Sequence, residues 1–130
     1  MAPHWNMPAR LRPYYEAELL ASRQLELDRD HRASWRHLER AHILGQQWPR
    51  PHTAVHWKML GFGIRLKNWR EILGQLPRLL TGGVKSFIGH IPVGNTGGAD
   101  VPPLRPMEIP EDLQLILALH GRRKHGSPTE

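Results

Sequence analysis

The sequence predicts an all-α fold with four main helices in two hairpins, a TPR-like arrangement, followed by an extended Gly/Pro-rich segment and a short final helix. Apolar residues recur at three- and four-residue spacing through most of residues 14–80, which is the period of an amphipathic helix. Capping residues and glycines separate these stretches. Segments starting at Asp30 and Asn68 also resemble each other, each carrying a tryptophan-bearing helix after a cap, at a repeat of about 38 residues.

The first hairpin is predicted from its start and stop signals. Pro13 suits the first turn of a helix over residues 14–27, because a helix leaves the N–H at that position unpaired. A second helix is expected over residues 31–44, with a cap from the Asp28–Asp30 break and a stop at Gly45.

The later helices follow the same logic. Pro51 is placed to open a third helix, whose apolar seam is Val55, Met59, Phe62 and Leu66. Asn68 is a good cap for a fourth helix, in which Trp69, Ile72, Leu73, Leu76 and Leu80 recur at helical spacing. Residues 112–120 form the expected final helix. We expect the five tryptophans to be packing residues because they are scattered through the helices.

The domain boundaries follow from composition. Residues 1–12 are Pro-rich and expected to be flexible, residues 13–120 form a single helical domain, and residues 121–130 form a disordered basic tail. The N-terminus lacks an apolar core of signal-peptide length, and no run reaches the length of a membrane span. We therefore expect a cytoplasmic protein without membrane contact.

Charge and cysteine content exclude several classes of function. The net charge is +6, but the 18 Lys and Arg residues are spread along the chain, so nucleic acid is an unlikely partner. The chain has no cysteine, which excludes disulfides, thiolate metal sites and a cysteine nucleophile. The segment 93–98 is Gly-rich but lacks the lysine of a phosphate-binding loop, and we interpret it as a turn.

Histidines are the residues that point to chemistry. His52 and His56 are four apart and so lie on one helical face, and an antiparallel hairpin would bring His42 to them. Glu39 is an acidic ligand candidate on the same side as His42, and Met59 offers a thioether that would favour copper over zinc. The alternative is that these histidines are structural packing residues or a pH-sensitive contact.

The same segment argues against an enzyme. Thr53 follows the first histidine of the pair, where a zinc hydrolase of the H-E-x-x-H type has glutamate. We therefore expect metal binding without catalysis.

Four blocks of sequence, at residues 37–46, 52–60, 68–80 and 91–101, resemble a small family of bacterial proteins known only as a domain of unknown function. The resemblance covers roughly residues 14–115. Members of that family are often encoded among heavy-metal resistance genes, so the resemblance implies an association with metals. It brings no established activity.

The predicted function is a small soluble protein that binds copper or zinc through His42, His52 and His56, with Glu39 or Met59 completing the shell, in metal resistance or homeostasis. The alternative is a helical-repeat adaptor that binds a protein partner and has structural histidines and no metal.

Overall fold

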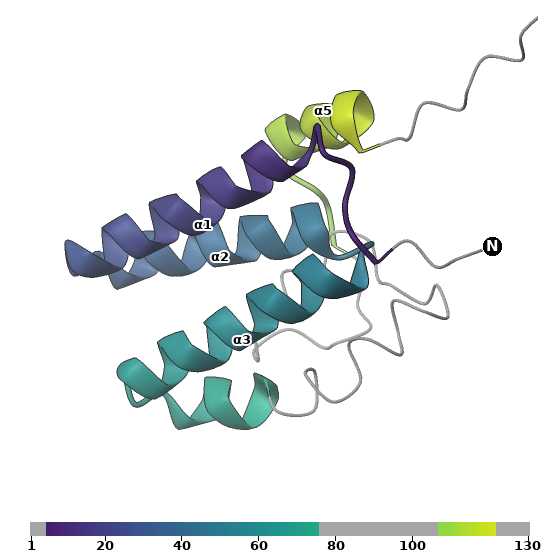
Figure 1. Cartoon of the computed structure of the whole chain (residues 1–130). Helices are drawn as coiled ribbons and strands as arrows, with labels where there is room; N and C mark the ends of the chain where they lie inside the picture. The colour runs from purple at the N-terminus through teal and green to yellow at the C-terminus, as the bar shows by residue number, and fades with distance from the viewer. Residues whose placement is uncertain (1–4, 76–106, 122–130) are drawn as a thin grey trace, which may run out of the picture.

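The computed structural model describes residues 5–75 and 107–121, and these residues are helical or irregular without a β-strand. The helices are α1 (Arg12–Leu27), α2 (His31–Gly45), α3 (Pro49–Arg65) and α5 (Glu111–His120), and residues 69–75 are also helical. Antiparallel α1 and α2 form a hairpin, α3 lies beside α2, and α5 lies near the start of α1 (Figure 1). The all-α prediction is confirmed. Of the predicted second hairpin the structure describes α3 and residues 69–75, which leaves the TPR-like arrangement a prediction. The Gly-rich turn at 93–98, most of the Gly/Pro-rich segment and residues 122–130 of the basic tail lie outside the described residues.

Local signals set the helix boundaries close to where they were predicted. The Asp30 carboxylate caps α2 by accepting from the backbone N–H of Ala33 at 3.2 Å. The helix α3 begins two residues earlier than expected because Pro49, like Pro51, can occupy its first turn. Asn68 caps the following helix, with its Oδ1 3.3 Å from the backbone nitrogen of Glu71.

The hydrophobic core is built around α2, which packs against α1, α3 and α5. Met7 and Leu11 before α1 are also buried in it. The largest apolar side chains that are fully buried are Leu11, Leu44, Val55, Met59 and Leu113. Between α1 and α2, Ser34 donates a hydrogen bond to the Ser22 carbonyl at 2.7 Å, so the polar contact within this interface is satisfied.

Tyr15 ties α1 to the turn between α2 and α3. Its hydroxyl donates to the carbonyl of Pro51 at 2.7 Å. Burial, and to a lesser extent the charge of Glu16, raises the pKa of Tyr15 well above its ordinary value. Gly45 ends α2 beside the ring, where an added Cβ would lie 2.9 Å from Tyr15 Cε2. The absence of a side chain at Gly45 therefore lets the two segments approach each other.

An arginine of α2 joins three helices. Arg40 Nε donates to Glu18 of α1 at 2.9 Å, and its Nη2 donates to Asp112 of α5 at 2.5 Å. The hydrogen bond from Arg40 lowers the pKa of Asp112. His37 also contacts Glu18, through Nδ1 at 2.5 Å. This network holds the final helix against the first hairpin.

The packing predictions for the tryptophans and the fourth helix need correction. Trp48 is buried, but Trp57 and Trp69 are 60% and 70% exposed. Leu73 is also exposed, whereas Glu71 and Gln75 of the same helix are buried. The described part of this helix thus buries a polar side, because α3 presents hydrogen-bonding partners there.

Within the described residues, no helix combines the length and the apolar character needed to cross a membrane.

Candidate metal centre

The hairpin of α2 and α3 brings three histidines to one point, as the sequence predicted. His42 lies in the last turn of α2, and His52 and His56 lie one turn apart near the start of α3. The connecting turn is short, and a hydrogen bond from the backbone N–H of Trp48 to the Gly45 carbonyl at 3.0 Å closes it. The two helices therefore face each other closely where the histidines are located.

Each of the three imidazole rings directs its Nε2 atom at the other two rings. The Nε2 atom of His42 lies 3.0 Å from that of His52 and 3.1 Å from that of His56, and the remaining pair is 3.0 Å apart. Ring centroids are 4.7 to 4.8 Å apart, with the ring planes steeply inclined to one another. All three side chains are buried. This is a compact, convergent set of three nitrogen donors.

These distances fit a transition-metal ion. Ligands about 2.1 Å from a six-coordinate ion would be about 3.0 Å apart on one face, and ligands at the same distance from a tetrahedral ion would be about 3.4 Å apart. The observed 3.0 to 3.1 Å separations match the first geometry and need only a small opening for the second. Three histidines on one face leave the opposite side of the ion for other ligands.

The three contacts among the Nε2 atoms cannot all be hydrogen bonds. An imidazole Nε2 atom is either a donor or an acceptor, according to its tautomer. Around a triangle of such atoms, two at most of the three contacts can pair a donor with an acceptor, and the third must place two like groups together. A cation accepting one lone pair from each ring removes this conflict.

A hydrogen-bond relay sets the tautomer of His56. The amide nitrogen of Gln75 lies 3.1 Å from the Glu71 carboxylate, so the amide oxygen must face the other way, where it lies 2.6 Å from His56 Nδ1. The oxygen can only accept, and His56 therefore carries its proton on Nδ1. Its Nε2 lone pair is then directed at the other two rings. This is the arrangement that metal-ligating histidines have in proteins.

The two other predicted ligands are placed differently. Among the described His, Asp and Glu residues, the group whose ligand atoms all lie within 4.8 Å of one another contains the three histidines and does not include Glu39. Met59 is fully buried, and its sulfur accepts from the Gln75 amide at 3.6 Å. Glu39 and Met59 as direct ligands stay predictions.

Sequence reasoning missed Glu71 and Gln75. Their spacing of four residues after the Asn68 cap places them on one helical face, which was the available signal. The apolar residues of that helix predicted the opposite face to be buried.

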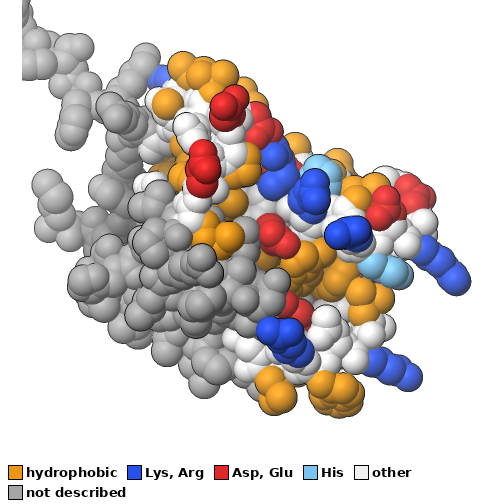
Figure 2. Space-filling view, turned by 180° about the vertical axis from the view of Figure 1, so that it is seen from behind, with side chains coloured by type: hydrophobic (Ala, Val, Ile, Leu, Met, Phe, Trp, Pro, Cys, Tyr) orange, Lys and Arg blue, Asp and Glu red, His pale blue; other side chains and the backbone are white. Residues whose placement is uncertain are grey.

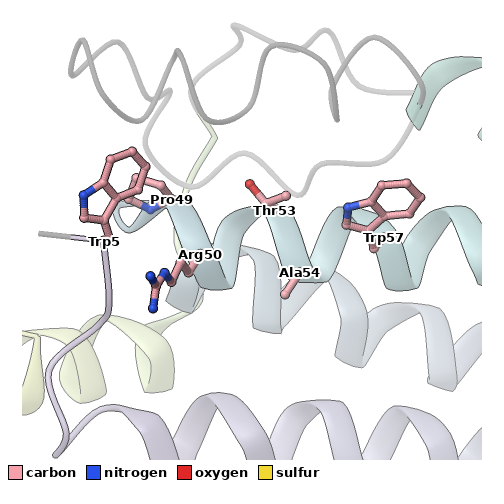
Figure 3. Close-up of a pocket in the computed structure, with 6 residues that line it drawn as sticks. All are labelled: Trp5, Pro49, Arg50, Thr53, Ala54 and Trp57. Atoms are coloured by element: carbon pink, nitrogen blue, oxygen red, sulfur yellow. The ribbon is translucent and has the colours of Figure 1, made fainter. Parts of the chain in front are cut away.

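The surface around α3 has hollows that the histidines do not line. One, of about 580 Å³, lies along the start of α3 and is lined by Trp5, Pro49, Arg50, Thr53, Ala54 and Trp57 (Figure 3). From behind, acidic and basic side chains alternate over the described part of the surface (Figure 2). That face therefore shows no single-sign patch of the kind that binds nucleic acid.

Comparison with known protein families gives a match over most of the chain. The model of a family described as a protein of unknown function (DUF3703) matches residues 9–117. No curated protein and no solved structure matches the chain.

Proposed function

The chain belongs to the DUF3703 family, whose description gives no function, and from the site itself we propose that it binds one transition-metal ion through His42, His52 and His56. The observation that carries the proposal is the convergence of three buried Nε2 atoms at 3.0 to 3.1 Å. The relay from Glu71 through Gln75 supports it, because it prepares His56 as a lone-pair donor.

Copper and zinc are the ions that the donors suit best. Imidazole nitrogen binds both, and the site has no thiolate because the chain has no cysteine. Met59 would add a soft sulfur for Cu(I), and Glu39 would add an oxygen for Zn²⁺. Met59→Leu is then expected to weaken Cu(I) more than Zn²⁺, and Glu39→Gln to do the reverse. Equal effects on both ions would remove the two residues from the proposed ligand set.

We propose storage or transfer of the ion in metal resistance or homeostasis, without catalysis. Burial of all three ligands favours retention of an ion over rapid turnover at an open site. Thr53 follows His52 at the position where a hydrolase of the H-E-x-x-H type carries its glutamate general base. Deletion of the gene is expected to lower tolerance to excess zinc or copper.

The test is calorimetric titration of the metal-free chain with Zn²⁺, Cu²⁺ and, under reducing conditions, Cu(I). We expect one ion per chain with a dissociation constant below about 1 μM. The H42A/H52A/H56A variant should lose that binding. The matched control is H31A/H37A/H120A, which removes three histidines elsewhere and should retain it.

A second variant keeps the test decisive if the triple variant unfolds. His52→Gln retains much of the side-chain volume and removes one nitrogen ligand, so the chain should fold and bind the ion much more weakly. The electronic absorption of bound Co²⁺ separates tetrahedral from six-coordinate geometry. An absence of binding, or binding equal in both triple variants, would refute the metal site.

The alternative function is a helical adaptor with structural histidines and no metal. It is favoured by the exposed apolar side chains on the described helices, among them Trp57, Trp69 and Leu73. Under that alternative, the wild type and the His52→Gln variant both bind metal negligibly, and the substitution changes only the stability of the fold.

A further inference from the structure

A groove runs between α1 and α3 over the face of α2, and it is separate from the histidine cluster. Its volume is about 1080 Å³. Leu38 of α2 lies at its base, and Leu19 of α1 and Ala54 of α3 line its sides. Ala54 points to the α1 side of its helix (Figure 3). Ser22 and Gly61 are the small residues that widen it.

Two contacts hold the groove at its ends. Tyr15 bonds to Pro51 at 2.7 Å where both helices start, and Arg65 Nη2 lies 2.9 Å from Glu26 where they finish. The eleven helical steps from Tyr15 to Glu26 span about 16 Å, or three helical turns. The two helices run in the same direction, so both walls offer residues at regular helical intervals (Figure 1).

The groove combines apolar side chains with a majority of basic charges, and the one acidic side chain among its described lining residues, Glu26, is paired with Arg65. Leu27 and Trp57, which line it, are 71% and 60% exposed. Arg23 of α1 and Lys58 of α3 stand on opposite edges, within about one turn of each other along the groove. Neither forms an ion pair with another described residue, whereas Arg65 is paired with Glu26.

We propose that this groove binds an acidic amphipathic helix of a partner protein, about three turns long, with an apolar stripe between two rows of Asp or Glu. The apolar stripe would cover Leu27 and Trp57, and the two acidic rows would meet Arg23 and Lys58. The exposed apolar side chains of Leu27 and Trp57 in the groove do not suit the phosphates of nucleic acid. A second copy of this chain is disfavoured by its net charge of +6.

The probe is a fluorescein-labelled helical peptide of about 14 residues, with leucines at i, i+3, i+4, i+7 and i+11 and glutamates on both flanks. A second peptide has lysine in place of each glutamate. Anisotropy titrations with the full chain should show binding of the Glu peptide, weakened by salt, and binding of the Lys peptide at least about tenfold weaker. Results with and without Zn²⁺ should agree, which separates this proposal from the metal site.

Charge reversal supplies the matched variants. R23E/K58E should lower the affinity for the Glu peptide at least about tenfold and raise the affinity for the Lys peptide. R32E/R36E makes the same change in charge on exposed α2 residues that do not line the groove, and should alter either affinity by less than about threefold.

Several results would overturn the proposal. They are equal affinities for the two peptides, no binding of the Glu peptide at protein concentrations up to about 1 mM, or the same loss of Glu-peptide affinity in R32E/R36E as in R23E/K58E. A dimer in light scattering that R23E/K58E dissociates would assign the groove to a second copy. The proposed partner would also be refuted if a DNA duplex displaced the Glu peptide from the wild-type groove and did not bind to R23E/K58E.

Discussion

Replacing Gln75 with leucine tests how the proposed centre is prepared for metal. Leucine is close to glutamine in size but removes the oxygen that accepts from His56 Nδ1 at 2.6 Å. In the metal-free protein, His56 can respond by moving its proton to Nε2. With an ion bound to Nε2, the proton must stay on Nδ1, and the buried N–H loses this acceptor. The substitution therefore weakens the metal-bound state more than the metal-free state.

The magnitude follows from that difference. An unsatisfied buried donor costs about 1 to 3 kcal/mol, which corresponds to an affinity loss of about 5- to 150-fold. This range agrees with the effect of removing hydrogen-bond partners from metal-ligating histidines, about 10- to 100-fold.

The assay is competition for Zn²⁺ with a chromophoric chelator, at a temperature where circular dichroism shows the variant to be folded. Folding must be checked because Glu71 also loses the Gln75 amide as a donor. Nitrogen-15 NMR of the imidazoles reports which nitrogen of His56 carries the proton. Gln114→Leu is the control, since Gln114 bonds to the Ile109 carbonyl on the exposed side of α5. An affinity unchanged within about twofold, or a wild-type His56 protonated on Nε2, would refute the relay.

Three further predictions concern stability. Gly45→Ala should lower the free energy of unfolding in urea by about 1 to 3 kcal/mol, although alanine favours helices, because its Cβ would lie 2.9 Å from Tyr15 Cε2 and 3.1 Å from Pro51 Cβ; a stabilised variant would contradict this packing. Because the pKa of Tyr15 is raised on folding, the contribution of its protonated side chain to the free energy of unfolding is complete below about pH 10 and falls by about 1.4 kcal/mol per pH unit above it. Urea titrations at several pH values should show this additional alkaline loss of stability in the wild type and not in Tyr15→Phe. Glu26→Gln should lower the free energy of unfolding, measured by thermal denaturation, by less than about 1 kcal/mol, since the paired Arg65 side chain is 55% exposed. A larger loss of stability would mean that the ion pair does more than close the end of the groove.

Helix positions were predictable because their signals are local. Asp30 and Asn68 cap helices through their own side chains, and Pro49 and Pro51 have backbone angles suited to a first turn. The hairpin followed from two such helices joined by a short turn. His42, His52 and His56 could then be brought together from spacing alone, since a four-residue separation fixes a common face.

The relay and the exposed tryptophans could not be predicted in this way. Periodicity shows which residues share a face, but burial depends on what packs against that face. Trp69 and Leu73 predicted a buried apolar side, yet Gln75 is buried because His56 and Glu71 supply its hydrogen-bond partners.

The sequence by itself determined where the described helices lie, to within a few residues at their ends, and the three histidines that one hairpin can bring together, because caps, prolines and periodicity act within a few residues. Only the tertiary structure decided which tautomer His56 adopts and which apolar side chains line an open groove. Both depend on contacts between residues far apart in the chain, such as Gln75 with His56 and Arg65 with Glu26. Their geometry exists only once α1, α2 and α3 have packed.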